Sequence, residues 1–358
     1  MNRSAASPVR TVRLTFGSPP PGADAPVRSD LSCATVRGNH LWVATDEGTR
    51  VERLTRTADG SYDEHEPVDL VRMLRLPMGK KQEIDIEGMH VEEDRLWLVG
   101  SHAHTRDKPD LAKNAPAEAI AQLGQVDENP NRWILARIPL ACLLPSEDEA
   151  AAKTQADPPA RLSVSKKGSA LLDLLAGDPH LAPFMALPAK ENGFDIEGIA
   201  ARGQQVFLGL RGPVLRGWAV ILELCLEPRA GKLKLKRLGA KGPRYRKHFL
   251  DLEGCGVRDL CWQGEDLLIL AGPTMVLDGA VRLHRWRPPA GSADSITKAS
   301  DCPAIMDLPS RRGSDRAEGI ALLEGSAEPE LLVVYDGPHP DRLHGGGSVD
   351  ADVFVLTG

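Results

Sequence analysis

The sequence predicts an all-β fold built from a repeated unit of short antiparallel strands. The motif Asp-Ile-Glu-Gly occupies residues 85–88 and recurs at residues 195–198, and a related Ala-Glu-Gly occupies residues 317–319. A polar turn and an apolar strand follow each copy, as in a β-hairpin. The glutamate precedes the first apolar residue of that strand by nine residues in the first two copies and by thirteen in the third. Such internal repetition determines the architecture.

The motif and the nine-residue spacing, with the insertion in the last unit allowed for, give one signature position in each unit. These positions are Ser32, Glu87, Glu197, Arg258 and Glu318. The fourth is Arg258 rather than Glu253, because Arg258 lies nine residues before the apolar strand at 267–270. Units of about 55 to 60 residues hold four short strands, and radial repetition of four-stranded blades is a β-propeller. We expect five blades, with six as the alternative if residues 100–190 form a degenerate unit.

The remaining segments fit a single domain over residues 1–358. A strand at 11–16 is well placed to pair with the last blade and close the ring, which removes an exposed sheet edge. We expect an insertion of loops and short helices at 104–190. It includes a short helix near 116–123 and a surface loop at 145–159 that is rich in Glu, Ala, Asp and Pro.

Composition narrows the class of protein. Apolar residues make up 42% of the 358 residues, which allows a sizeable core, and the formal net charge is −6 with acids and bases well mixed. This balance argues against a nucleic-acid partner, because nucleic-acid-binding surfaces are usually basic. We also expect no membrane span and no secretory signal, since no apolar run approaches ~18 residues. Six cysteines without a Cys-x-x-Cys pair indicate reduced thiols and a cytoplasmic location.

Three segments carry a resemblance to a known family. Residues 190–198, 210–218 and 256–260 resemble an uncharacterised bacterial family, known as domain of unknown function 3616. The resemblance covers nearly the whole chain and implies a β-propeller, while the family has no established activity. More distantly, the Asp-x-Glu-Gly motif is similar to that of phytase-like and gluconolactonase-like propellers. That second resemblance implies a divalent metal in the central channel.

The repeat also predicts a cluster of charged side chains at one mouth of the channel. The first strand of a blade lines the axis and the second runs back, so the start of one and the end of the other share a face. We expect Glu87, Glu197 and Glu318 to ring this mouth and to hold a divalent metal. Calcium or magnesium suits oxygen ligands from several loops. Zinc or manganese becomes an alternative if histidines join the set.

Other residues at the same mouth are candidates for catalysis and ligand binding. Arg211 and Arg258 would stabilise developing negative charge, and His102 is the candidate general base. The ligand-binding candidates are Asp46, Glu47, Lys80, His104, Lys190 and Asp336. A basic residue lies seven positions before each signature glutamate, at Lys80, Lys190 and Arg311. These cations could neutralise the ring without a metal, or they could bind an anionic small molecule.

These features favour a metal-dependent hydrolase that acts on a phosphate ester or a lactone. The rival interpretation is a non-catalytic propeller that binds an acidic ligand or a partner protein. A purely structural role for the Glu-Gly pairs, in which glycine permits close approach near a narrow axis, is a third interpretation. The sequence contains no Gly-x-Ser-x-Gly elbow, P-loop or His-Glu-x-x-His motif. Fold alone does not identify a substrate.

Overall fold

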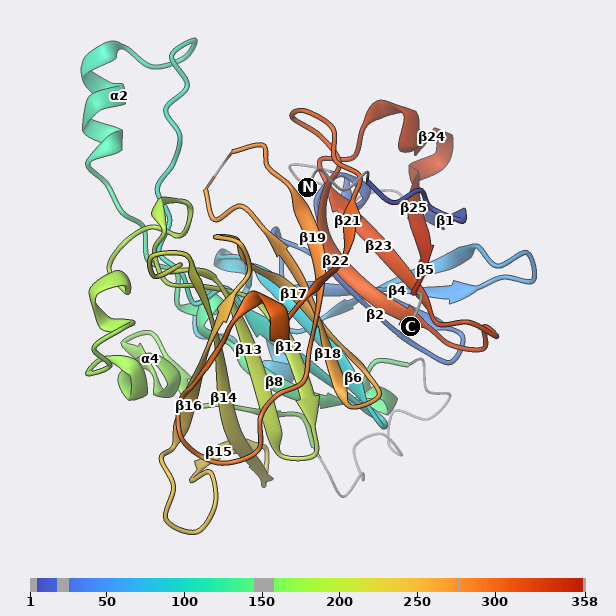
Figure 1. Ribbon diagram of the computed structural model, residues 1–358. Coiled ribbons are helices and arrows are strands. Elements are labelled where there is room, and N and C mark those ends of the chain that lie inside the picture. The colour runs from blue at the N-terminus through green and yellow to red at the C-terminus, as the bar shows by residue number, and fades with distance from the viewer. Residues whose placement is uncertain (1–4, 18–25, 145–157, 276, 357–358) are drawn as a thin grey trace.

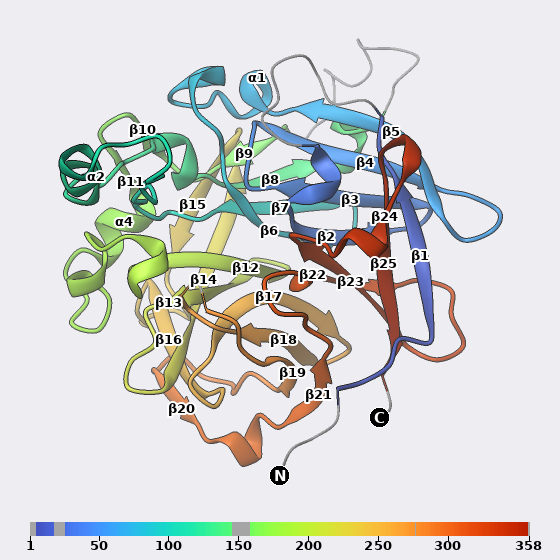
Figure 2. The ribbon, with the colours of Figure 1, turned by 90° about the horizontal axis from the view of Figure 1, so that it is seen from above.

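The computed structural model describes residues 5–17, 26–144, 158–275 and 277–356, and the strands in these ranges form a β-propeller (Figures 1 and 2). Successive antiparallel meanders begin with β2 (Leu31–Arg37), β6 (Ile86–Glu92), β12 (Asp195–Arg202), β17 (Gly256–Gln263) and β22 (Arg316–Leu323). Each of these first strands contacts the next, and β22 contacts β2, so together they enclose a central axis. In Figure 2 they lie at the centre of the molecule, with the later strands outside.

The outer strands complete each meander. The first holds β3 (His40–Thr45), β4 (Arg50–Arg56) and β5 (Tyr62–Asp69), and the second holds β7 (Arg95–Gly100), β8 (Leu135–Pro139) and β9 (Ala160–Arg161). The third holds β13 (Gln205–Gly212) and β14 (Trp218–Arg229), which pairs with both β15 (Lys232–Lys236) and β16 (Tyr245–Asp251). The fourth holds β18 (Asp266–Gly272), β19 (Val281–Trp286) and β21 (Ala304–Leu308). The last holds β23 (Glu330–Asp336), β25 (Ser348–Val355) and the N-terminal β1 (Arg10–Thr15).

The N-terminal strand closes the ring as the sequence predicts. β1 pairs antiparallel with β25 over six residues, from Arg10 opposite Val353 to Thr15 opposite Ser348. Its other edge forms a single parallel bridge, between Leu14 and Tyr62 of β5. The last meander therefore combines strands from both ends of the chain, and few backbone groups are left for edge-to-edge pairing.

Every signature position is a β-bulge. In every blade the register between the first and second strands shifts at the signature residue, and the residues skipped are Ser32, Glu87, Glu197, Arg258 and Glu318. The third blade has a second shift, between Asp195 and Ile196. A bulge re-aims the side chain of the extra residue and bends the strand. This finding confirms the alignment of the repeat, including the choice of Arg258 in the fourth unit. The sequence repeat therefore marks one backbone feature, which is occupied by three kinds of side chain.

The glycine after the signature residue allows the first strands to approach one another. A Cβ atom on Gly88 would lie 2.9 Å from the backbone nitrogen of Ile199 in the next blade, and one on Gly319 would lie 2.8 Å from the Cα atom of Cys33. Both distances are shorter than ordinary contact, so the narrow axis requires glycine at these positions. The apolar cores lie farther out, between neighbouring blades, where Trp97 of β7 packs in one cluster with Leu208 of β13.

The insertion expected at 104–190 divides into several parts. Its helix α2 (Pro116–Leu123) has the predicted bounds and lies in an arm that projects from the body (Figure 1). The insertion also supplies β8 and β9, a small hairpin of β10 (Val164–Ser165) and β11 (Gly168–Ser169), and α4 (Ala170–Leu175). The loop expected at 145–159 lies outside the described residues except for its last two. Single bridges join neighbouring blades into larger sheets, so the number of sheets does not give the number of blades. The number of blades stays a prediction.

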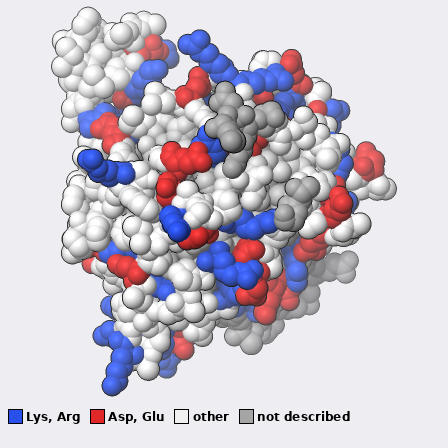
Figure 3. All heavy atoms as spheres, in the orientation of Figure 1, with Lys and Arg blue, Asp and Glu red and all other residues white. Residues whose placement is uncertain are grey.

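Shorter elements complete the architecture. They are α1 (Val71–Leu74), β20 (Ser295–Thr297), which pairs parallel with β16, and β24 (Leu343–His344), which pairs with β25. Within the described ranges no helix is long and apolar enough to cross a membrane. On the face seen in Figure 3, basic and acidic side chains are intermingled rather than separated into fields of one sign.

Candidate functional site

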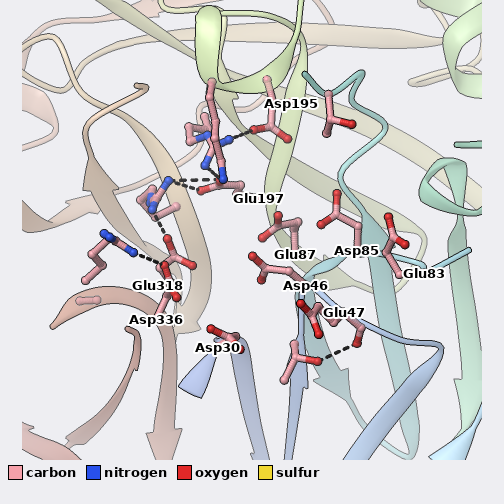
Figure 4. Close-up of a pocket in the computed structure, with 18 of the residues that line it drawn as sticks. Asp30, Asp46, Glu47, Glu83, Asp85, Glu87, Asp195, Glu197, Glu318 and Asp336 are labelled. Carbon is pink, nitrogen blue, oxygen red and sulfur yellow. Dashed lines mark hydrogen bonds and ion pairs between the residues drawn. The ribbon is translucent and has the colours of Figure 1, made fainter. Parts of the chain in front are cut away.

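A deep cavity of about 1510 Å³ lies at the mouth where the first strands begin. Its walls come from the segments before the first strands and after the second strands, which is the arrangement that the repeat predicts (Figure 4). The predicted site residues that line it are Asp46, Glu47, Lys80, Glu87, Lys190, Glu197, Arg211, Arg258, Glu318 and Asp336. Residues that are far apart in the sequence therefore share one cavity, and the structure divides them into groups of different character.

One side of the mouth is an arginine-bridged cluster, made of Asp195, Glu197, Arg211, Arg258 and Glu318. The Nη2 atom of Arg211 lies 2.6 Å from the Asp195 carboxylate, and its Nη1 atom lies 2.5 Å from that of Glu197. Arg258 donates from Nη1 to Glu197 at 3.2 Å and from Nη2 to Glu318. All five side chains are buried. Two guanidinium groups thus bind three carboxylates, and the five side chains together come from three blades.

This pairing changes the roles expected for the arginines. Arg211 and Arg258 were predicted to stabilise negative charge on a substrate, but each guanidinium group is engaged by two protein carboxylates. Burial raises the pKa of the Glu197 carboxyl, and both arginines oppose that rise. Buried charges are tolerated when they are paired in this way. The bridges instead cross-link the inner strands β12, β17 and β22 at the axis.

The opposite side of the mouth is an acidic cluster of Asp46, Asp85 and Glu87. One carboxylate oxygen from each residue lies within 4.8 Å of the other two, and within the described ranges this is the only such group of three potential metal ligands. Asp46 follows β3, while Asp85 and Glu87 flank the start of β6. Figure 4 shows the three side chains converging on one part of the cavity, away from the arginine contacts.

The acidic cluster has little positive charge to balance it. Asp85 accepts a hydrogen bond of 2.5 Å from the Ser101 hydroxyl and lies 3.2 Å from the Nε atom of Arg132. Asp46 and Glu87 form no ion pair within 4 Å in the part of the chain that the structure describes. The Oδ1 atom of Asp46 is buried without a hydrogen-bond partner. Among the described residues, Asp46 and Glu87 therefore have no direct cationic partner, although Lys190 opposes the rise in the pKa of Asp46.

Burial and mutual repulsion perturb all three acids. Burial raises the pKa of Glu87 well above its usual range, and the Asp46 and Asp85 carboxylates raise it further. Burial, with Glu318 and Asp85, likewise raises the pKa of Asp46 well above its usual range. The pKa of Asp85 is also raised, chiefly by burial, although Arg132 opposes the rise. A cluster that resists ionisation when empty is stabilised in its charged form by a bound cation.

The three glutamates expected to share a metal do not converge. Glu197 and Glu318 are held by arginines, whereas Glu87 turns to Asp46 and Asp85. The donors that do converge are carboxylate oxygens from separate loops, and this donor set fits calcium or magnesium. Asp46 was predicted to bind a ligand, and Asp85 belongs to the repeated Asp-Ile-Glu-Gly motif. The structure brings both into contact range of Glu87 as candidate metal ligands.

The two histidines lie apart from the cavity lining. His102 is 3% exposed, and its Nδ1 atom is 2.9 Å from the carbonyl oxygen of Gly100. Burial lowers the pKa of its ring to about 4. His104 faces the base of the arm, with its Nε2 atom 4.0 Å from Glu128. Since the backbone at His102 is left-handed, with φ of 57°, this segment is not an extended strand, in which residues two apart would point to the same face.

Asp30 is a candidate that sequence reasoning missed. It lines the cavity, and burial, aided by Asp336 and Glu47, raises its pKa to about 6. Asp30 lies two residues before Ser32, as Asp85 lies two residues before Glu87 and Asp195 two before Glu197. That spacing could have identified it, because the aspartate is retained in a unit whose signature residue is serine. A carboxyl group that titrates near neutral pH in a cavity is a candidate acid or base.

Basic side chains lie at the rim of the cavity. Lys80, Lys190 and Arg311, each seven residues before a signature glutamate, all line it. Lys80 lies 2.5 Å from Asp69 and Arg311 lies 2.9 Å from Asp341, so both are paired. Lys190 has no ion pair with any residue that the structure describes. The mouth therefore contains the acidic cluster and has a basic rim on which some cations are unpaired.

Comparisons with known proteins identify a family but no activity. A family model described as "Protein of unknown function (DUF3616)" matches residues 30–352, which confirms the resemblance seen in the sequence. A comparison with curated proteins yields no match. Solved structures with similar folds include a glutaminyl cyclase from Myxococcus xanthus, at 11% identity over 98% of this chain and 100% of that one, with a TM-score of 0.38. They also include the calcium-binding regucalcin of Agrobacterium tumefaciens, at 11% identity over 97% and 96%, with a TM-score of 0.35. Likeness at this level does not extend to substrate or chemistry.

Proposed function

The chain belongs to this family of unknown function, and we propose that it is a small-molecule hydrolase dependent on a divalent cation held by Asp46, Asp85 and Glu87. The observation that carries the proposal is the contrast in charge compensation within one cavity. Glu197 and Glu318 have arginine partners, whereas Asp46 and Glu87 have none among the described residues. The substrates proposed are phosphate esters or lactones, because both are cleaved by water at a centre that a cation can polarise.

Electrostatics support a cation rather than an empty acidic cluster. Two unit charges 4.8 Å apart repel by roughly 3 to 4 kcal/mol at an effective dielectric of about 20. Three ionised carboxylates would sum three such terms, opposed by Arg132 at 3.2 Å from Asp85 and by Lys190, which lowers the pKa of Asp46 without forming an ion pair. Raised pKa values relieve part of the repulsion in the free protein. A calcium or magnesium ion would relieve it with all three groups ionised.

The protein's own residues supply the other requirements of hydrolysis. A bound divalent cation polarises the substrate and lowers the pKa of coordinated water. Asp30 lines the same cavity, and its pKa of about 6 lets it hold or release a proton near neutral pH. Lys190, on the rim, is available to orient an anionic substrate. In this proposal Arg211 and Arg258 keep the inner strands in place and do not touch the substrate.

A non-catalytic binding propeller is the second candidate. It is favoured by one observation, that no histidine occurs among the described residues that line the cavity. Hydrolysis would then depend on carboxyl groups and the cation alone for proton transfer. A binding protein would need only the acidic cluster and the basic rim to recognise a charged ligand.

Metal content and turnover together test the proposal. We expect protein purified without chelators to carry one calcium or magnesium ion per chain, and Glu87→Gln to lose it. The metal-loaded protein should hydrolyse at least one compound in a panel of phosphate esters and lactones, with turnover reduced at least 100-fold in Glu87→Gln. Glu265→Gln, at a glutamate side chain that is 78% exposed, is the matched control. A metal-loaded protein without turnover supports the binding candidate, and protein that takes up no cation contradicts the metal-dependent proposal.

A further inference from the structure

We infer that the preferred substrate is a phosphate monoester of an apolar alcohol, held with its phosphate between the acidic cluster and the basic rim and with its apolar part against Met275 and Leu277. This inference rests on the proposed function and selects between its two substrate classes. Two observations carry it: unpaired cations on the rim, and exposed apolar side chains on one wall of the same cavity. A lactone is neutral and would leave those cations without a role.

The unpaired cations are Lys81, Lys190 and Arg312. All three line the cavity, and none forms an ion pair within 4 Å with any residue in the described ranges. They come from the segments before β6, β12 and β22, so they face the mouth from three blades. Elsewhere on the rim, Lys80, Arg311 and Arg316 are paired with aspartates. Three free cations around one opening match the charge and the several oxygens of a phosphate group.

The apolar wall consists of four residues around the loop between β18 and β19. They are Pro273, Met275, Leu277 and Val281, and all line the cavity. Met275 is 47% exposed and Leu277 is 65% exposed, so each leaves apolar surface in water. Few large apolar residues of the described chain are so exposed, and an apolar patch inside a polar cavity is typical of a ligand-binding surface. An apolar group on the substrate would remove that surface from water.

The size of the cavity agrees with a larger organic substrate. At about 1510 Å³ it exceeds the roughly 300 to 1,000 Å³ of typical small-molecule pockets. Inorganic phosphate or a metal ion alone would fill a small part of it. A phosphate ester with an extended apolar group could place its phosphate beside the acidic cluster and its apolar end against Leu277.

The reaction balances with water as the only co-reactant. A water oxygen forms a bond to phosphorus while the bond from phosphorus to the ester oxygen breaks. The proton lost by water is taken up by the departing alkoxide, directly or through Asp30. The products are a free apolar alcohol and inorganic phosphate, and no oxidant or reductant is consumed.

Binding of unreactive phosphonates separates the two halves of the inference. Hexylphosphonate and methylphosphonate would each be titrated calorimetrically into the full chain loaded with magnesium. We expect hexylphosphonate to bind at least about tenfold more tightly, because only its chain reaches the apolar wall. Leu277→Ser should reduce the ratio to about threefold or less, and Lys190→Met should weaken both ligands by roughly tenfold. Ile296→Ser, at an exposed residue outside the cavity lining, is the matched control.

The outcomes distinguish this inference from the function on which it rests. Equal affinity for the two phosphonates overturns the apolar part, and equal affinity for hexylphosphonate and hexano-6-lactone overturns the anionic part. Turnover of hexyl phosphate is measured by the release of inorganic phosphate. Turnover by the wild type that is lost in both Lys190→Met and Leu277→Ser supports both parts of the inference. If the protein binds magnesium but discriminates between none of these ligands, the inference fails and the metal site stands. If it binds no magnesium, the proposed function itself fails.

Discussion

The second and third blades carry the same four-residue motif and use it in opposite ways. Asp85 and Glu87 in one blade, and Asp195 and Glu197 in the other, occupy equivalent positions around the same kind of bulge. Fourteen residues after the glutamate the sequences differ, with Ser101 in the second blade and Arg211 in the third. Ser101 donates a hydrogen bond to Asp85, whereas Arg211 forms ion pairs with both acids of its blade.

This difference shows that the partner, and not the motif, determines the role of a repeated carboxylate. With an arginine opposite, the pair becomes a buried cross-link between inner strands. With a serine opposite, Asp85 keeps one contact with Arg132, while Glu87, beside Asp46, has no arginine partner among the described residues, and the group is suited to a cation. The repeat therefore provides the scaffold, and the residue at the end of the second strand distinguishes the candidate metal site from the arginine-bridged cluster.

Converting one blade toward the other should give the largest effect. We expect Arg211→Ser to lower the free energy of unfolding by roughly 3 to 5 kcal/mol at neutral pH, because it leaves Asp195 and Glu197 buried with less compensation. Chemical denaturation measures this loss. Arg287→Ser is the matched control, since Arg287 is 68% exposed and pairs with Asp266 at the surface. That variant should lose less than about 1 kcal/mol. Equal losses in the two variants would contradict a structural role for the bridges.

The acidic cluster should make stability depend on pH and on calcium. The pKa values of Asp46 and Glu87 are raised in the folded protein, so their contribution is present at low pH and is lost as pH rises through those values. The metal-free protein should therefore lose stability progressively as pH rises above about 4, the ordinary range of a carboxyl group. Calcium at a 100-fold excess over its Kd should raise Tm by roughly 3 °C at pH 8, and by less at pH 5. Thermal melting with and without calcium at both pH values measures these shifts. A shift in Tm that is independent of pH would argue against Asp46 and Glu87 as calcium ligands.

Neutralising one member of the acidic cluster should have a smaller and opposite effect to that of Arg211→Ser. Without metal at pH 8, we expect Glu87→Gln to raise the free energy of unfolding by about 1 kcal/mol, because it removes a charge that burial and two neighbours disfavour. Denaturation in the presence of chelator measures it. Glu265→Gln should stay within about 0.5 kcal/mol of the wild type. Marked destabilisation by Glu87→Gln would show that this glutamate has an unrecognised structural partner.

The histidines should have the smallest effect of all. His104 lies outside the cavity lining, beside Glu128. We expect His104→Ala to leave turnover and calcium affinity within about twofold of the wild type. Steady-state kinetics and calorimetry of this variant test whether turnover and calcium binding are independent of His104. A large loss of turnover would show that His104 acts on the site despite lying outside the cavity lining.

Much of the fold could be predicted from spacing alone. Counting nine residues back from the second strand located four of the five bulges, including Ser32 and Arg258, where the side chain differs from glutamate. The Glu-Gly pair located the fifth, at Glu318, where the spacing is thirteen. This succeeded because the bulge occupies the same backbone position in each hairpin, and a repeated backbone position leaves a periodic trace in sequence. The helix at Pro116–Leu123 was predictable for a similar local reason, since a proline begins it and Gly124 follows its end.

The division of the site could not be predicted in the same way. Which carboxylate meets an arginine depends on side chains from different blades, such as Arg258 reaching both Glu197 and Glu318. The left-handed backbone at His102, which removes its ring from the expected face, has no local signal such as glycine. Asp30 did have a signal, in its spacing from Ser32, but its raised pKa comes from Asp336 and Glu47 and from burial. Spacing identifies positions, and only the folded arrangement identifies partners.

Calorimetric titration of calcium into chelator-treated protein at pH 8 tests the central claim most directly. For the wild type, the arrangement of Asp46, Asp85 and Glu87 predicts one calcium ion bound per chain. Affinity should fall at least tenfold in Glu87→Gln, which loses one of the three carboxylate ligands, and should be unchanged in Glu265→Gln. Undiminished calcium affinity in Glu87→Gln, or no calcium binding by the wild type, would contradict the assignment of the acidic cluster as the metal site.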